Sequence, residues 1–180
     1  MKTKTIAIAA IIFTGLAFTY ITNWTVDTAK SKVTFTANGP LGKVDGSFGG
    51  LKTNIQFDEN NLAASSIHAS IEVNTIETGI GLRNKDLRDK PEWFDAAKYP
   101  QLTIQSKAIK KLDSGYKMDA DLTIKGVTKP VIIAFSFTPA GNGGLFMSQF
   151  TLNREDFGLG KSGGSVAKEV SVKLEVPVNK

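Results

Sequence analysis

Apolar and polar side chains alternate in short runs along most of this chain. The clearest run has Ile67, Ala69, Ile71 and Val73 at every second position, with polar residues between them. A period of two is typical of a half-buried β-strand, because successive side chains of a strand point to opposite faces. The other runs with this alternation are 24–27, 33–37, 44–57, 102–108, 116–124, 131–137, 146–152 and 170–176.

Turn-forming stretches separate these runs, so the pattern predicts about eight sizeable strands. Within 44–57 the apolar positions change parity, which predicts a bulge or kink near Gly49 and Gly50. The expected architecture is an up-and-down antiparallel barrel, because closure leaves no unpaired strand edge. An open sandwich is the alternative. Such a barrel has an interior just wide enough to be filled by side chains or to hold one small ligand.

The alternation alone does not distinguish an apolar face that points inward from one that points outward, as in an outer-membrane barrel. The polar faces carry charges, among them Lys32, Glu72, Lys173 and Glu175. Packing these charges inside a narrow barrel would bury many ion pairs at a high desolvation cost. The sequence therefore favours an apolar interior.

The stretch 81–106 is the one long interruption of the strand rhythm. Asp89, followed by Pro91 and Glu92, has the arrangement of a helix N-cap with a capping box. These residues predict a short helix from Asp89 through about Ala97. A single helical insertion in an all-strand chain is expected to close or line one end of the barrel.

The N-terminus has the pattern of a secretory signal peptide. Lys2 and Lys4 precede an apolar run over 6–17, with small residues near its end. The run falls short of the ~20 residues of a membrane-spanning helix, although an uncleaved anchor is the alternative. The sequence predicts a signal peptide over 1–19, one domain over 20–180, and a periplasmic or secreted mature protein.

Charge and cysteine content narrow the function. Removal of Lys2 and Lys4 lowers the formal net charge from +5 to +3, and the lysines and arginines form no cluster larger than the pair Lys110 and Lys111. This pattern argues against nucleic-acid binding. The chain has no cysteine, so no disulfide can form, and stability must come from the core.

Few residues suit catalysis or metal binding. The single histidine, His68, lies on the polar parity of its strand, which disfavours a catalytic triad or a zinc site. The glycine-rich stretch 158–164 lacks the order of a phosphate-binding loop and is expected to be a loop. Carboxylates in the 83–95 insertion could form an acid/base pair, but helix caps and ion pairs explain them better. We expect no catalytic residue, no metal and no cofactor.

Six segments together match the pattern of a known family: 24–27 (WTVD), 31–35 (SKVTF), 42–48 (GKVDGSF), 87–100, 122–131 (LTIKGVTKPV) and 154–158 (REDFG). On these segments the chain resembles the YceI-like family of exported, lipocalin-like, polyisoprenoid-binding proteins, over essentially the whole mature sequence. The 86–100 segment departs from the family pattern: Asp86 stands where the family usually has His, Asp89 stands where it has Ser, and one extra residue precedes Trp93.

The resemblance implies an all-β fold, an eight-stranded antiparallel lipocalin-like barrel with a short helical insertion near one end. It implies non-enzymatic binding, storage or transport of an isoprenoid lipid, either a polyprenyl chain or an isoprenoid quinone, in the bacterial envelope. The alternative is an envelope enzyme that acts on an apolar substrate through carboxylates of the 83–95 insertion. The expected partner is the isoprenoid lipid, without nucleic acid; transient membrane contact and a homodimer are left open.

The predicted ligand-binding residues are apolar side chains expected to face the barrel interior or its lid. A barrel lined in this way offers shape and apolarity but few polar anchors. These residues are Phe35, Phe48, Ile71, Val73, Leu87, Trp93, Phe94, Ile104, Met118, Leu122, Ile133, Phe135 and Phe150.

Overall fold

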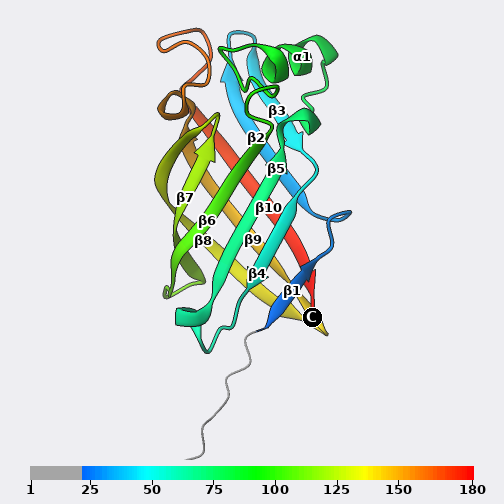
Figure 1. Cartoon of the computed structure of the whole chain (residues 1–180), viewed down its shortest axis with the longest axis vertical. Helices are drawn as coiled ribbons and strands as arrows, with labels where there is room; N and C mark the ends of the chain where they lie inside the picture. The colour runs from blue at the N-terminus through cyan, green and yellow to red at the C-terminus, as the bar shows by residue number, and fades with distance from the viewer. Residues whose placement is uncertain (1–21) are drawn as a thin grey trace, which may run out of the picture.

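The strands form one antiparallel sheet that closes into a tall barrel, shown with its long axis vertical in Figure 1. The structure is a computed structural model and describes residues 22–180, so the predicted signal peptide lies outside the described residues. The strands are β1 (Asn23–Val26), β2 (Lys32–Gly39), β3 (Gly42–Phe48), β4 (Lys52–Gln56), β5 (Ser66–Glu72), β6 (Gln101–Lys111), β7 (Tyr116–Ile124), β8 (Val127–Ala140), β9 (Gly143–Asn153) and β10 (Glu169–Asn179).

Closure takes place at β10. This strand pairs with β9 along its whole length, with β2 over Val170 to Glu175, and with β1 near the chain end. β1 also pairs with β4. Around the barrel, β1 and β2 share one strand position and β3 and β4 share the next, so the ten strands fill the eight positions of a closed barrel. The break between β3 and β4 confirms the predicted kink, and Gly50 there has a φ of 64° that suits glycine. The expected barrel is confirmed, and the open sandwich is excluded.

The helical insertion is present, but the predicted helix bounds are wrong. The α-helix α1 spans Gly81–Asp89 and therefore ends where a start was expected. Lys90 is extended, with φ −76° and ψ 136°, because the ring of the following Pro91 disfavours a helical residue before it. Turns follow as far as Lys98, and Asp95 adopts a φ of 50°. Three short 3₁₀ helices complete the fold: η1 (Leu62–Ala64), η2 (Val73–Thr75) and η3 (Arg154–Phe157).

The apolar faces of the strands point inward, and aromatic rings close the end of the barrel opposite α1. Phe57 is 1% exposed and packs edge-on against Tyr116, with ring centroids 5.1 Å apart, and against Phe146 at 5.3 Å. Phe135 and Phe137 complete this aromatic plug. The plug closes one end of the barrel interior by packed rings rather than by a loop.

The plug has one polar anchor. The Tyr116 hydroxyl donates a 2.6 Å hydrogen bond to Oε1 of Glu59. Burial of the phenol, followed by this contact with a carboxylate, raises the pKa of Tyr116 to about 12. Tyr116 therefore stays neutral and keeps donating this bond throughout the physiological pH range.

None of the helices among residues 22–180 has the length and apolarity needed to cross a membrane. α1 and the loops that follow it lie at the upper end of the barrel, and the C-terminus lies at the lower end (Figure 1). The two ends therefore differ: rings fill one, and a helix with loops covers the other.

Candidate functional site

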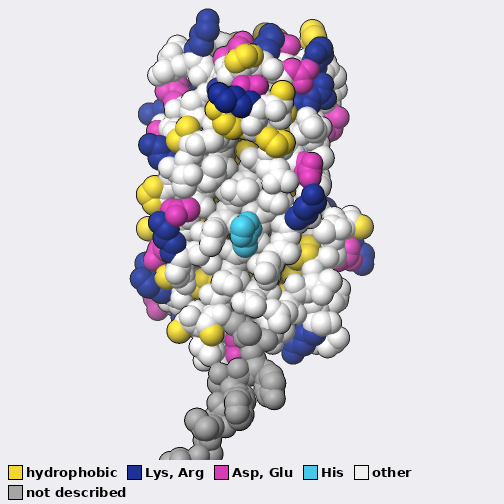
Figure 2. Space-filling view, in the orientation of Figure 1, with side chains coloured by type: hydrophobic (Ala, Val, Ile, Leu, Met, Phe, Trp, Pro, Cys, Tyr) yellow, Lys and Arg dark blue, Asp and Glu magenta, His cyan; other side chains and the backbone are white. Residues whose placement is uncertain are grey.

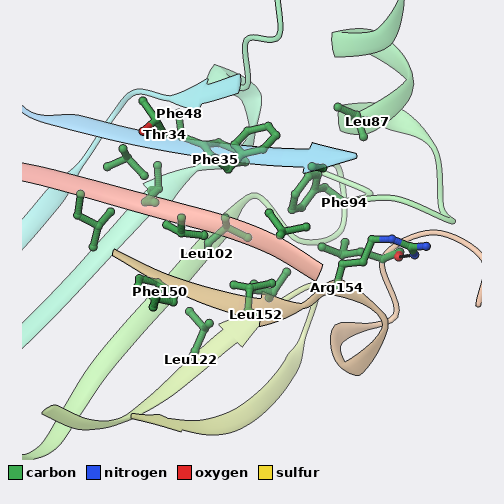
Figure 3. A pocket seen from close by; sticks show the side chains of 18 of the residues that line it. Thr34, Phe35, Phe48, Leu87, Phe94, Leu102, Leu122, Phe150, Leu152 and Arg154 are labelled. Carbon is green, nitrogen blue, oxygen red and sulfur yellow. Dashed lines mark hydrogen bonds between the residues drawn. The ribbon is translucent and has the colours of Figure 1, made fainter. Parts of the chain in front are cut away.

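A cavity of about 800 Å³ occupies the barrel interior above the aromatic plug. This volume lies within the range of about 300–1,000 Å³ that is usual for small-molecule sites. Its walls are almost wholly apolar because the inward parity of each strand carries aliphatic and aromatic residues. Figure 3 shows side chains such as Phe35, Leu102, Leu122 and Phe150, from separate strands, around this space.

Every predicted ligand-binding residue except Val73 lines this cavity. Whether they contact a ligand stays a prediction. Val73 was expected to continue the alternation of Ile67, Ala69 and Ile71, but β5 ends at Glu72 and Val73 begins η2. The turn of the 3₁₀ helix takes Val73 out of the strand parity, and it packs in the core with Leu102 and Phe157, at 1% exposure.

Several cavity residues were absent from the predicted set. β10 contributes Val170, Val172, Leu174 and Val176, whose alternation marked a strand, although it gave no reason to rank them as ligand contacts. Ala69 also lines the cavity and is small enough to leave space beside Ile104 in the neighbouring strand. Their shared parity with the predicted residues was the signal that could have identified them.

The cavity opens at the end that carries α1. Three apolar residues on its rim are exposed: Leu41 in the β2–β3 hairpin at 102%, Ile80 at 53% and Leu82 in α1 at 72%. We call these three residues the apolar rim. Figure 2 shows apolar side chains among charged ones near this end of the molecule. An apolar wall that continues to exposed residues gives an apolar molecule a continuous path into the barrel.

Side chains of the helical insertion form the inner face of this opening. Leu87 on α1, and Trp93 and Phe94 on the turns after it, line the cavity. The Phe94 ring packs edge-on against Phe48 of β3, with centroids 5.7 Å apart. The backbone N–H of Phe94 donates to the Leu87 carbonyl, which ties the turns to the helix. The insertion therefore forms an apolar lid over part of the barrel, as Figure 3 shows for Leu87 and Phe94.

Arg154 is a buried cation at the same end, at 3% exposure. Its guanidinium donates to the backbone carbonyls of Ala167 at 3.0 Å and Val166 at 2.6 Å, and also to the carbonyls of Leu159 and Lys161. It also lies 3.3 Å from a carboxylate oxygen of Glu155. These contacts hold the loop 158–168 against the barrel, so the buried charge is fully partnered. In the sequence this arginine stands out only as part of the 154–158 segment, and its place on the cavity wall was not predicted.

The carboxylates of the insertion form ion pairs. Asp89 lies 2.8 Å from Lys85 and 2.6 Å from Arg88, and Asp86 lies 2.9 Å from Lys90. Hydrogen bonds from Arg88, then from Lys85, hold the pKa of Asp89 well below its usual range. Of these carboxylates and the neighbouring Glu92, Asp86 alone lines the cavity among the described residues, so no acid/base pair converges on it.

His68 and the remaining carboxylates are the other candidates for chemistry in the described part of the chain. His68 is exposed on the outer face of β5, as expected from its parity. Within residues 22–180, no group of three His, Cys, Asp or Glu side chains is placed to hold a metal ion. The arrangement suits the sequestration of an elongated apolar molecule, since its walls remove apolar surface from water without ordering polar groups around it.

Comparison with known proteins indicates one family. The family profile of the YceI-like domain matches residues 24–178. A UPF0312 protein of Yersinia enterocolitica is 35% identical over 137 residues, which cover 73% of this chain and 71% of that protein.

Solved structures share the fold. The crystal structure of Burkholderia cenocepacia BcnA has a TM-score of 0.80 and 29% identity, covering 85% of this chain and 99% of that one. A polyisoprenoid binding domain from Saccharophagus degradans, implicated in plant cell wall breakdown, has a TM-score of 0.69 and 18% identity, covering 89% of this chain and 99% of that one. A Campylobacter jejuni YCEI protein has a TM-score of 0.67 and 20% identity, covering 100% of this chain and 99% of that one.

Proposed function

Since this chain belongs to the YceI-like family, we propose that it binds an isoprenoid lipid inside its barrel and stores or transports it without chemical change. The ligand would be a polyprenyl chain or an isoprenoid quinone. The observation that carries the proposal is the apolar cavity of about 800 Å³, closed by the aromatic plug at one end and open beside α1 at the other. The description of a structural neighbour as a polyisoprenoid binding domain supports it.

The energetics of tail burial favour retention of the lipid. Burial is worth about 0.8 kcal/mol per CH₂ group, so a tail of about twenty carbons gains roughly 16 kcal/mol before costs. This gain is reduced heavily by the lost motional freedom of the bound lipid and by competition from a membrane, into which the lipid also partitions. The remainder still makes escape into water slow. A brief contact of the apolar rim with a membrane fits this proposal, because it would spare the tail a passage through water.

We expect a lipid to accompany the protein through purification. Organic extracts of the folded protein should contain an isoprenoid, identified by mass spectrometry, in an amount close to one molecule per chain. After delipidation, the protein should bind added isoprenoid again in a saturable manner. Lipid-free extracts together with absence of rebinding would refute the proposal.

The proposal has no catalytic step. The alternative of an enzyme that uses carboxylates of the 83–95 insertion required two of them to converge on the cavity. Asp89 is instead held in ion pairs, and Asp86 is bonded to Lys90. No observation in the described part of the chain favours the enzyme.

We also propose export to the periplasm or beyond, with removal of a signal peptide over 1–19. The proposal rests on Lys2, Lys4 and the apolar run 6–17. The intact mass of protein recovered from the periplasm should correspond to a chain that lacks the first seventeen to nineteen residues, the span where small residues end the apolar run. Recovery of the full-length chain in the membrane fraction would instead indicate an anchor.

A further inference from the structure

Two arginines line the cavity near its opening, and their surroundings differ. All the nitrogens of the Arg154 guanidinium donate to partners in the loop 158–168 or to Glu155. Each of the three guanidinium nitrogens of Arg154 therefore has at least one partner within the fold. Its role is to hold the loop.

Arg83, on α1, is held differently. Its Nε donates to the Thr78 hydroxyl at 2.8 Å, and its Nη2 donates to the Thr78 carbonyl at 2.6 Å. Thr78 is itself 7% exposed and is fixed by Asn84, whose side-chain oxygen accepts from the Thr78 N–H at 2.8 Å. One edge of the guanidinium is thus anchored to a buried turn, which fixes its direction.

The remaining nitrogen of Arg83, Nη1, has no hydrogen-bond partner within residues 22–180, and no carboxylate in that range lies within 4.0 Å of the guanidinium. The other charged groups of the cavity opening are engaged: Asp86 pairs with Lys90, and Lys43 lies 3.4 Å from Asp45. Arg83 is therefore a pre-oriented cation with a free donor on the wall of a mostly apolar cavity.

We propose that Arg83 binds the head group of the isoprenoid through Nη1 and selects lipids that carry an acceptor oxygen. This inference rests on the proposed function and adds the class of ligand and its orientation. The head group lies at the opening beside α1, and the end of the tail faces the aromatic plug. Two head groups share the required chemistry, a phosphate and a quinone carbonyl, because a guanidinium donates to both.

The proposal predicts a defined loss of selectivity. A hydrogen bond from a charged group is worth enough to change affinity by roughly 10-fold or more. Arg83→Gln should therefore weaken the binding of a polyprenyl phosphate and of an isoprenoid quinone by about 10-fold relative to squalene. Squalene is an isoprenoid hydrocarbon with no acceptor oxygen, so its binding reports the apolar cavity alone.

The experiment is a competition. The delipidated mature protein is mixed with equal amounts of the three lipids. The bound lipids are then quantified by mass spectrometry after gel filtration. Because the ratio of bound lipids is measured, a lower folded fraction of a variant does not change the result. Arg88→Gln is the matched control: Arg88 is on the same helix, pairs with Asp89 and does not line the cavity. Arg83→Lys keeps a cationic donor and should give ratios between those of the wild type and Arg83→Gln.

The outcomes separate the sources of the head group. A fall in the phosphate ratio alone identifies an anionic lipid, a fall in the quinone ratio alone identifies a carbonyl lipid, and a fall in both supports the shared contact. Ratios in Arg83→Gln equal to those of the wild type overturn the inference, and so does an equal change in Arg88→Gln. If the wild type binds none of the three lipids, the proposed function itself fails, which is a distinct result.

Discussion

Replacement of Ala69 by tryptophan is expected to weaken lipid binding strongly while the barrel remains folded. Ala69 lies in β5 and its side chain faces the cavity, opposite Thr53 of β4 and Ile104 of β6. An indole ring at this position occupies space that a tail would need. Displacing about four CH₂ groups costs roughly 3 kcal/mol, which corresponds to an affinity about 100-fold lower.

The measurement is the amount of isoprenoid in organic extracts, together with rebinding by delipidated protein. His68→Trp is the matched control, because His68 is the adjacent residue and is exposed on the outer face of the same strand. Circular dichroism should show the same strand content in both variants. Wild-type lipid content in a folded Ala69→Trp protein would contradict binding within the barrel.

Arg154→Met is expected to cause the largest loss of stability, roughly 3–5 kcal/mol in the free energy of unfolding. The substitution leaves the carbonyls of Leu159, Val166 and Ala167 without their donor. Buried acceptors without partners carry their full desolvation penalty. The loop 158–168 is expected to lose its attachment first, because four of its carbonyls accept hydrogen bonds from this side chain.

Urea unfolding gives the free energy, and limited proteolysis should show new cleavage within 158–168. Arg88→Met is the control, because its ion pair with Asp89 is partly exposed to solvent and surface pairs contribute about 0–1 kcal/mol. A loss below about 1 kcal/mol in Arg154→Met would show that the loop is held by other contacts.

Prediction from the sequence succeeded where a pattern repeats. The alternation of β5, β7 and β10 predicted their inward faces, and most predicted ligand-binding residues lie on the cavity wall. The helical insertion was predicted with the wrong bounds, because the capping pattern at Asp89 is a local signal. The extended conformation imposed on Lys90 by Pro91 overrides it. The placement of Val73 on the cavity wall was wrong for a related reason, since alternation does not reveal where a strand ends and a 3₁₀ helix begins.

The sequence by itself determined the closed barrel architecture, the apolar interior and the family, because each depends on patterns of residues close together along the chain. The count of about eight strands matches the eight barrel positions but not the ten separate strands. Only the tertiary structure decided which end is closed and which is open. The aromatic plug brings Phe57 together with Tyr116 and Phe146 from distant strands, and no local pattern encodes that meeting. The same holds for the two cavity arginines, which the sequence does not distinguish. Folding gives every guanidinium nitrogen of Arg154 a partner and leaves Nη1 of Arg83 without one among residues 22–180.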